Sequence, residues 1–193
     1  MIHPTAVIDE GAIIGEDCRV WHFSHVCATA VLGDATSIGQ NVYVANHVTI
    51  GSQCKIQNNV SIYEGVHIAD RVFLGPSCVF TNDKNPRATK MDWVLTPTYV
   101  EEGVTIGGNA TIVCGTRLGP YCMIGAGSTV THDVPPYALM VGVPARQIGW
   151  VSKEGWKLTL PVKYPGSYVS TTCPVTGETY VLIGDKQVVH PSE

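Results

Sequence analysis

The side chains best suited to chemistry in this chain are amides and carboxylates that recur at a spacing of eighteen residues. The sets with this spacing are Asn46, Glu64 and Asn82; Gln40 and Asn58; and Asn41 and Asn59. Amides and carboxylates bind polar ligands through hydrogen bonds, although an amide cannot act as a base. An asparagine at a turn has a simpler alternative role, because it tolerates left-handed backbone geometry and can pair with a stacked neighbour.

The spacing of eighteen has a structural meaning because the whole sequence repeats every six residues. An apolar residue occupies every sixth position from Ile8 to Phe80, and again from Ile106 to Val130 in a register displaced by two. A second, usually small residue stands two places before each, so both side chains point to the same side of a strand. This period predicts an all-β fold, a parallel β-helix of hexapeptide repeats with three short strands per coil. Residues eighteen apart then stack in columns about 4.8 Å apart.

The repeat is interrupted once, and it ends before the chain does. Residues 1–133 are predicted to form the solenoid, with an extruded loop at about 81–103 that reads TNDKNPRATKMDWVLTPTYVEEG. Long loops in compact domains commonly bind or catalyse, so the column that ends at Asn82 is the preferred site. Residues 134–193 should form an extension that leaves the solenoid at a proline-rich segment, followed by a small cap of short β-strands.

Composition excludes several classes of function. The net charge is −4, with no run of Lys or Arg, so nucleic acid is not an expected partner. The N-terminus has no signal-peptide pattern and no segment is apolar over the length of a membrane span, so we expect a cytoplasmic protein without a membrane partner. Charged residues make up only 15% of the chain, which indicates that other subunits cover part of the surface. Cysteines at the small inward position of the repeat are expected to be buried free thiols: Cys18, Cys54, Cys78 and Cys122.

Several strings resemble one enzyme family. The repeat resembles the hexapeptide-repeat acyltransferases, whose fold is a left-handed parallel β-helix. The strings RVWHFSHV, GQNVYVAN, KIQNNVSIYEGV, FTNDKNPR and GAGSTVTHDVPPYALMVGVPAR are similar to sugar-nucleotide N-acetyltransferases. The best match is to the enzymes that acetylate UDP-2-acetamido-3-amino-2,3-dideoxyglucuronate for bacterial surface polysaccharides, over residues 1–155. The dTDP-3-amino-6-deoxyhexose enzymes and the UDP-4-amino sugar enzymes are the alternatives.

The resemblance implies a homotrimer with active sites at subunit clefts, where acetyl-CoA lies along the later coils beside a UDP-amino sugar. It places Asn82 at the sugar amine as the catalytic residue. The candidate contacts to the substrate are Gln40, Asn58, Asn59, Glu64, Lys84 and Arg87. Lys84 and Arg87 are suited to a pyrophosphate or to the carboxylate of a uronate. The candidate contacts to acetyl-CoA are Gly107, Gly108, Ala126 and Arg146, with a backbone N–H near Gly107 or Gly108 stabilising the oxyanion.

Two other mechanisms and two other functions stay open at this point. A histidine can act as general base in related families, and His25 and His47 are the candidates here. γ-Type carbonic anhydrases share the architecture and bind zinc through three histidines, but the ligand pair that they space by four residues does not occur here, and no metal is expected. A non-catalytic solenoid is the remaining alternative. The tail string CPVTGETY resembles half of a zinc ribbon, but its single Cys173 cannot complete a four-ligand site.

Overall fold

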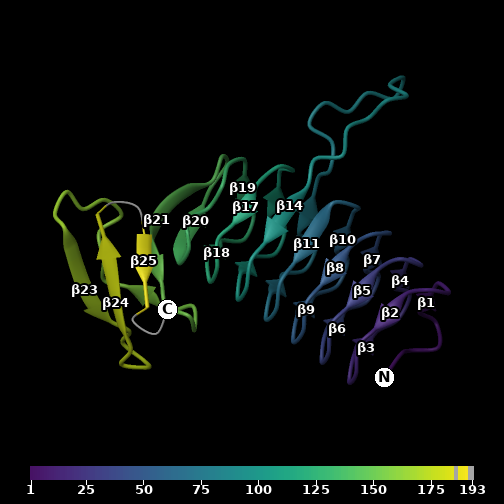
Figure 1. Cartoon of the computed structure of the whole chain (residues 1–193), viewed down its shortest axis with the longest axis horizontal. Coiled ribbons are helices and arrows are strands. Elements are labelled where there is room, and N and C mark those ends of the chain that lie inside the picture. The colour runs from purple at the N-terminus through teal and green to yellow at the C-terminus, as the bar shows by residue number, and fades with distance from the viewer. Residues whose placement is uncertain (185–186, 191–193) are drawn as a thin grey trace.

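The computed structural model describes residues 1–184 and 187–190. Three parallel sheets form the faces of a prism, and the coils stack from the N-terminus to the C-terminal cap (Figure 1). The strands of face 1 are β1 (Val7–Ile8), β4 (His25–Val26), β7 (Tyr43–Val44), β10 (Ser61–Ile62), β13 (Val79–Phe80), β16 (Thr111–Ile112) and β19 (Thr129–Val130). The strands of face 2 are β2 (Ile13–Ile14), β5 (Val31–Leu32), β8 (Thr49–Ile50), β11 (Val66–Ile68), β14 (Thr98–Val100) and β17 (Arg117–Leu118). The strands of face 3 are β3 (Arg19–Val20), β6 (Ser37–Ile38), β9 (Lys55–Ile56), β12 (Phe73–Leu74), β15 (Thr105–Ile106), β18 (Met123–Ile124), β20 (Ala138–Val141), β21 (Arg146–Val151) and β22 (Lys157–Leu158).

The predicted left-handed parallel β-helix is confirmed. Every third strand pairs in parallel, and the register joins residues eighteen apart, as between His25 and Tyr43 or between Tyr43 and Ser61. The edges of the prism are named here by the residues that turn them. Edge I joins face 3 to face 1 at residues 22–23, 40–41, 58–59, 76–77, 108–109 and 126–127. Edge II joins face 1 to face 2 at residues 28–29, 46–47, 64–65, 82 and 114–115.

The core is the single column of inward side chains that the period of six predicts. From β3 onward the apolar residue of each repeat is buried, and the cysteines at the small inward position are buried free thiols. Burial raises the pKa of Cys78 to about 12 and also raises the pKa of Cys54. These thiols are therefore packing residues, because a reactive cysteine requires an accessible thiolate.

Glycine allows one coil to lie close to the next beside edge I. A Cβ at Gly75 would lie 2.5 Å from the backbone nitrogen of Gly108, and a Cβ at Gly107 would lie 2.4 Å from that of Ala126. Both distances are far below a van der Waals contact. Glycine therefore allows a close backbone approach at these two positions, whereas Gln57 holds the same position on the coil between Gly39 and Gly75.

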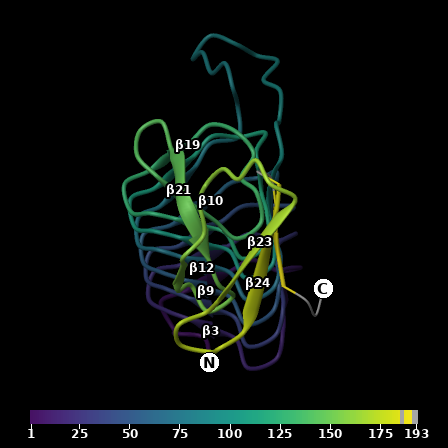
Figure 2. The same ribbon diagram turned by 90° about the vertical axis from the view of Figure 1, so that its left-hand side faces the viewer.

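The loop leaves the solenoid after β13 and projects from edge II (Figures 1 and 2). Pairing resumes at β14, where Val66 pairs with Thr98, thirty-two residues away instead of eighteen. Fourteen residues are thus inserted, which explains the shift of the repeat by two. The loop is shorter than the expected range of 81–103, because Thr98 and Val100 already follow the later register and are buried in the core.

The C-terminal part both extends and caps the prism. Pairing continues beyond residue 133, since β20 adds to face 3 in parallel with β18 before β21 and β22 return antiparallel. The segment expected to leave the solenoid therefore prolongs one face. The cap is an antiparallel sheet of β23 (Tyr168–Thr172), β24 (Thr179–Ile183) and β25 (Gln187–Val189).

No helix in the described part of the chain has the length and apolar character needed to cross a membrane.

Candidate functional site

The structure stacks Asn46, Glu64 and Asn82 at edge II, because each stands two residues after a strand of face 1 and the three strands are in register. Their surroundings differ. The side-chain oxygen of Asn46 accepts hydrogen bonds from the backbone N–H and the hydroxyl of Thr29, one coil below, at 3.2 and 3.1 Å. The side-chain amide of Asn82 has no hydrogen-bond partner among the described residues and is partly exposed. Asn46 therefore has a structural role, whereas the amide of Asn82 is available to a ligand.

The base of the loop surrounds Asn82. The carbonyl of Asn82 accepts the N–H of Thr96 at 3.0 Å, which holds the two ends of the loop together. Leu95 packs against Gly65, directly after Glu64: a Cβ on that glycine would lie 2.9 Å from the Leu95 side chain. These contacts fix the backbone of Asn82 while its amide stays accessible.

The two basic residues of the loop are placed differently. Lys84 reaches back to edge II, since a Cβ on Gly115, one coil above Asn82, would lie 2.8 Å from its ammonium nitrogen. Arg87 is exposed further along the loop, and its guanidinium donates to the carbonyl of Pro86 at 2.9 Å. Lys84 is therefore near Asn82 within the chain, and Arg87 is directed elsewhere.

The predicted residues Gln40, Asn58 and Asn59 lie at edge I. The side-chain oxygen of Asn58 accepts the backbone N–H of Gln40 at 2.9 Å, and that of Asn59 accepts the amide N–H of Asn41 at 3.2 Å. Asn41 and Asn59 have φ of 56° and 62°, the left-handed geometry that asparagine tolerates. Stacking and turn formation thus explain both residues of the Asn41–Asn59 pair. Gln40 and the amide N–H groups of Asn58 are exposed.

The later coils of edge I consist largely of bare backbone. Gly108 has the same register as Gln40, whose backbone N–H donates to the side chain of Asn58 on the next coil. The residue on the coil above Gly108 is Ala126, which has no side-chain acceptor. In the part of the chain that the structure describes, the N–H of Gly108 has no acceptor. The N–H of Gly107 is bound to the carbonyl of Ile124 at 2.8 Å. Of the two predicted oxyanion donors, only Gly108 is free to act.

Arg146 also lies near the later coils of edge I. It begins β21, pairs with Val141 of β20, and is exposed. A Cβ on Gly125 would lie 2.8 Å from the Val141 side chain, so the end of β20 packs against Gly125, next to Ala126. The four residues predicted to contact acetyl-CoA therefore share one end of one edge.

The predicted residues occupy two edges of the chain and not one. Gly107, Gly108, Gln40 and Asn58 are at edge I, whereas Asn82, Glu64 and Lys84 are at edge II. A strand of face 1 separates the edges: six residues lead from Asn58 to Glu64, a span of at most about 20 Å when extended. Within one chain, Asn82 and Gly108 therefore stand at the two ends of the strands of face 1.

The histidines proposed as alternative bases are both held by acidic neighbours. His25, on face 1, has its Nε2 at 3.1 Å from both carboxylate oxygens of Asp9. His47, at edge II, has its Nε2 at 4.0 Å from the carboxylate of Glu64 and its Nδ1 at 3.2 Å from the hydroxyl of Thr29. His25 lies three coils below the strand that precedes Asn82, about 14 Å away. Only His47 is close to the Asn82 column.

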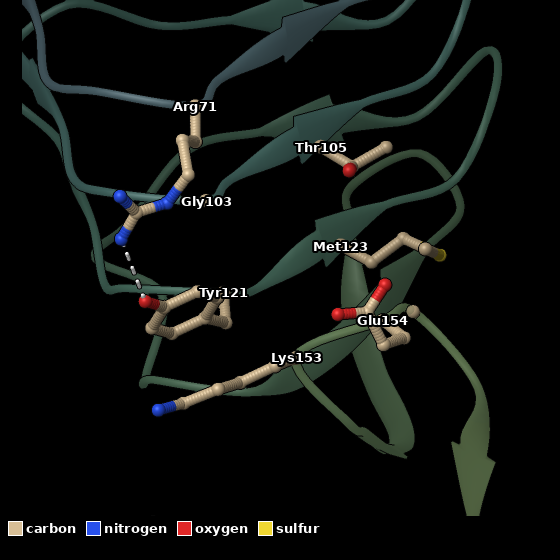
Figure 3. A pocket seen from close by; sticks show the side chains of 8 residues that line it. Arg71, Gly103, Thr105, Tyr121, Met123, Lys153 and Glu154 are labelled. Atoms are coloured by element: carbon tan, nitrogen blue, oxygen red, sulfur yellow. Dashed lines mark hydrogen bonds between the residues drawn. The ribbon is translucent and has the colours of Figure 1, made fainter. Parts of the chain in front are cut away.

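Two of the clefts on face 3 include residues that the sequence pattern does not select. One, of 340 Å³, is lined by Trp21 and His22 together with the predicted Gln40 and Asn58. The other, of 510 Å³, lies between face 3 and the start of the extension and is lined by Arg71, Tyr121, Lys153 and Glu154 (Figure 3). Nothing in the sequence pattern singled out Arg71 or Tyr121, because their proximity arises from different coils.

The second cleft is polar and its cations are already engaged. Arg71 forms an ion pair with Glu102 and donates to the hydroxyl of Tyr121 at 3.4 Å, as the dashed line in Figure 3 marks. The Lys153 ammonium lies 5.3 Å from the centre of the Tyr121 ring. This arrangement stabilises the junction between prism and extension.

Comparison with known proteins agrees with the period and the fold. The family model for the bacterial transferase hexapeptide (six repeats) matches residues 29–62, 47–82 and 97–132. These segments are similar to that family. They include both edge columns described above, up to Asn82 and from the end of the loop onward.

Two curated proteins and one solved structure illustrate what the chain is similar to. A segment of 61 residues is 51% identical to the dTDP-3-amino-3,6-dideoxy-α-D-galactopyranose 3-N-acetyltransferase of Aneurinibacillus thermoaerophilus and covers 32% of each chain. A segment of 62 residues is 52% identical to the bifunctional protein GlmU of Thermotoga petrophila, covering 32% of this chain and 13% of that one. The match thus spans a third or less of each relative. A hexapeptide-repeat-containing acetyltransferase of Vibrio cholerae, solved in complex with acetyl-coenzyme A, superposes with a TM-score of 0.50 and 26% identity over 72% of this chain and 70% of that one.

Proposed function

We propose that the protein is an N-acetyltransferase that moves an acetyl group from acetyl-CoA to the 3-amino group of a UDP-linked amino sugar, UDP-2-acetamido-3-amino-2,3-dideoxyglucuronate. The observation that carries this proposal is the partnerless amide of Asn82 at the base of the loop, on a scaffold of bacterial transferase hexapeptide repeats. Similarity to a 3-N-acetyltransferase and to an acetyltransferase solved with acetyl-CoA supports the reaction class.

The reaction requires positioning more than acid–base chemistry. The neutral amine attacks the thioester carbon, and the new C–N bond gives a tetrahedral intermediate with a negative oxygen. When the intermediate collapses, the C–S bond breaks and the departing CoA thiolate accepts the surplus proton from the nitrogen. The side-chain oxygen of Asn82 accepts a hydrogen bond from the amine and directs its lone pair, while the N–H of Gly108 stabilises the oxyanion. The thiol chemistry belongs to the cofactor, and the protein supplies alignment.

This mechanism needs two chains, because Asn82 and Gly108 lie at different edges of one chain. We propose a homotrimer in which edge II and the loop of one subunit face edge I of the next, so that acetyl-CoA lies between Gly107, Gly108, Ala126 and Arg146 of one copy and Asn82 of the other. Exposed apolar side chains at these edges support contact between copies: Phe23 at edge I is 62% exposed and Met91 in the loop is 94% exposed.

The substrate contacts follow from the same arrangement. Glu64 and Lys84 accompany Asn82 at edge II, and Lys84 is the nearer candidate for the carboxylate of a uronate. Gln40, Asn58 and Asn59 lie across the proposed cleft on the partner's edge I, with Arg87 reaching over from the loop. The nucleotide then extends along the amide column of edge I.

A dTDP-3-amino-6-deoxyhexose is the second candidate substrate, favoured by the identity to the A. thermoaerophilus enzyme. The test is an acetyl-CoA assay that follows free thiol with UDP- and dTDP-linked 3-amino and 4-amino sugars. We expect the UDP-3-amino uronate to give the highest kcat/KM. A 6-deoxy dTDP sugar that is turned over better would replace the uronate, and no thiol release with any amino sugar would overturn the enzymatic proposal.

A further inference from the structure

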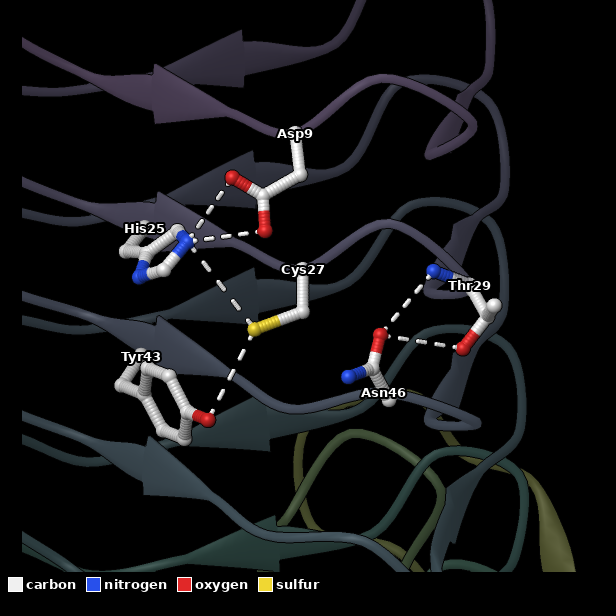
Figure 4. A network of polar contacts seen from close by, with 6 residues as sticks. All are labelled: Asp9, His25, Cys27, Thr29, Tyr43 and Asn46. Carbon is white, nitrogen blue, oxygen red and sulfur yellow. Dashed lines mark hydrogen bonds and ion pairs between the residues drawn. The ribbon is translucent and has the colours of Figure 1, made fainter.

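A cluster on face 1 brings together three different metal-ligating groups. Asp9 and Cys27 occupy the same register on adjacent coils, and His25 stands two residues before Cys27, so all three side chains lie on the outer side of the face. Figure 4 shows the carboxylate, the imidazole and the thiol pointing toward one another. Their ligand atoms lie within 4.8 Å of one another.

Cys27 differs from the cysteines of the inward column. It faces outward, yet it is only 6% exposed, because it lies among the side chains of Asp9, His25 and Tyr43. Its sulfur is 4.0 Å from Nε2 of His25 and 3.6 Å from the hydroxyl of Tyr43. Packing of the core does not require a thiol at this position, since the side chain is outside the core.

The geometry argues against a nucleophilic triad. In such a triad the imidazole binds the nucleophile through one nitrogen and the carboxylate through the other. Here Nε2 of His25 faces both partners, at 3.1 Å from Asp9 and 4.0 Å from Cys27. Convergence of three ligand groups on one point is the arrangement of a cation site.

We propose that Asp9, His25 and Cys27 bind a divalent zinc ion on face 1. Zinc is bound tetrahedrally by thiolate, imidazole and carboxylate at about 2.0–2.3 Å, which places ligand atoms about 3.3–3.8 Å apart. The observed separations of 3.1 and 4.0 Å bracket that range. A thiolate and a carboxylate neutralise the charge of Zn²⁺, and the sulfur and nitrogen donors disfavour Mg²⁺ and Ca²⁺.

Three protein ligands would leave one coordination position for a water molecule. Bound zinc joins the first coil to the second. It also removes His25 from the candidates for general base. The inference does not depend on the proposed acetyl transfer.

The test uses the metal alone. Chelator-treated full-length protein is titrated with Zn²⁺ by calorimetry and with Co²⁺ by absorption, where a thiolate ligand gives an intense charge-transfer band. We expect one ion per chain, and the band should be lost in Cys27→Ser with zinc binding weakened at least about tenfold. Asp9→Asn should keep the band and also weaken binding about tenfold. Cys173→Ser, which removes a buried thiol outside the cluster, should behave as wild type.

Two results would overturn the site: no binding of Zn²⁺ to the wild-type chain at micromolar concentration, or unchanged binding in Cys27→Ser. Circular dichroism of each variant confirms that the fold is retained, because both substitutions preserve size and lie outside the core. Acetyltransferase activity plays no part in these measurements, so a failed substrate assay and a failed metal titration remain distinguishable.

Discussion

The asparagines at the edges of the prism divide by what their amides bind. Asn46, Asn58 and Asn59 each accept a hydrogen bond from a neighbouring coil, whereas the amide of Asn82 has no partner in the described part of the chain. The same residue type therefore has two uses on one scaffold. Stability depends on the first group, and the proposed chemistry depends on Asn82.

Replacing Asn82 with alanine should lower kcat about 100-fold, since loss of the group that aims the amine misplaces the reactants. The measurement is thiol release at saturating acetyl-CoA. Asn46→Ala is the matched control, because it removes an amide from the same column. It should cost about 1 kcal/mol of unfolding free energy and leave kcat unchanged. Full activity in Asn82→Ala with loss in His47→Gln would instead favour the histidine mechanism.

The N–H of Gly108 can be removed with little risk to the fold, because Pro76 occupies the same register one coil below. Gly108→Pro should lower kcat by roughly 100- to 1000-fold through loss of the oxyanion donor, with a smaller effect on KM for acetyl-CoA. Gly108→Ala keeps the N–H and should retain activity. Equal loss of kcat in the two variants would show that the side chain, and not the N–H, disturbs the site.

At the scale of the elements, the close approach of two coils beside edge I is tested at Gly107. Gly107→Ala should reduce the unfolding free energy by about 1–3 kcal/mol, because the new Cβ would lie 2.4 Å from the Ala126 nitrogen. In Gly108→Ala the nearest atom would be the Pro76 carbonyl at 3.2 Å, so the change should be within about 1 kcal/mol. Denaturant unfolding of both variants checks this, and equal costs would refute the role assigned to coil contact.

The turn between β23 and β24 should make the stability of the chain depend on pH. Burial by itself raises the pKa of Cys173, but hydrogen bonds from Thr176, Ser152 and the N–H of Val175 favour the thiolate and lower the pKa from 9.0 to about 7. Because the folded pKa is depressed, the stabilisation is complete above about pH 9 and is lost as pH falls through about 7. The Tm of wild type minus that of Cys173→Ser should therefore rise from about pH 6 to about pH 9. A constant difference would contradict this.

The sequence predicts the strands well, but it does not predict which side-chain amides and backbone N–H groups already have hydrogen-bond partners. The period of six located the strands, and the spacing of eighteen placed Asn46, Glu64 and Asn82 on one edge, because both follow from local geometry. The predicted loop of about 81–103 includes the strand Thr98–Val100, although Val100 stands six residues before Ile106 and carries the later register. Which amides are satisfied, and which N–H of Gly107 and Gly108 is free, depends on contacts between coils that no spacing reveals.

For the whole molecule, the separation of Asn82 and Gly108 on two edges makes a prediction about assembly. The chain should form a trimer in solution. If each site combines edge II of one subunit with edge I of the next, mixed trimers of Asn82→Ala and Gly108→Pro chains regain intact sites. Random assembly from equal amounts should restore about a quarter of the sites. Activity of the co-expressed mixture checks this, and a mixture no more active than its components would place each site within one chain.

The loop insertion has a consequence for how such a protein can change. The fourteen additional residues are not a multiple of six. The coils before and after the loop nevertheless pair in register, because the pairing depends on the strands and not on the length of the chain between them. The length of the loop therefore does not affect the geometry of the prism. The loop can therefore be exchanged, and substrate preference with it, without changing the strand pairs that stabilise the fold.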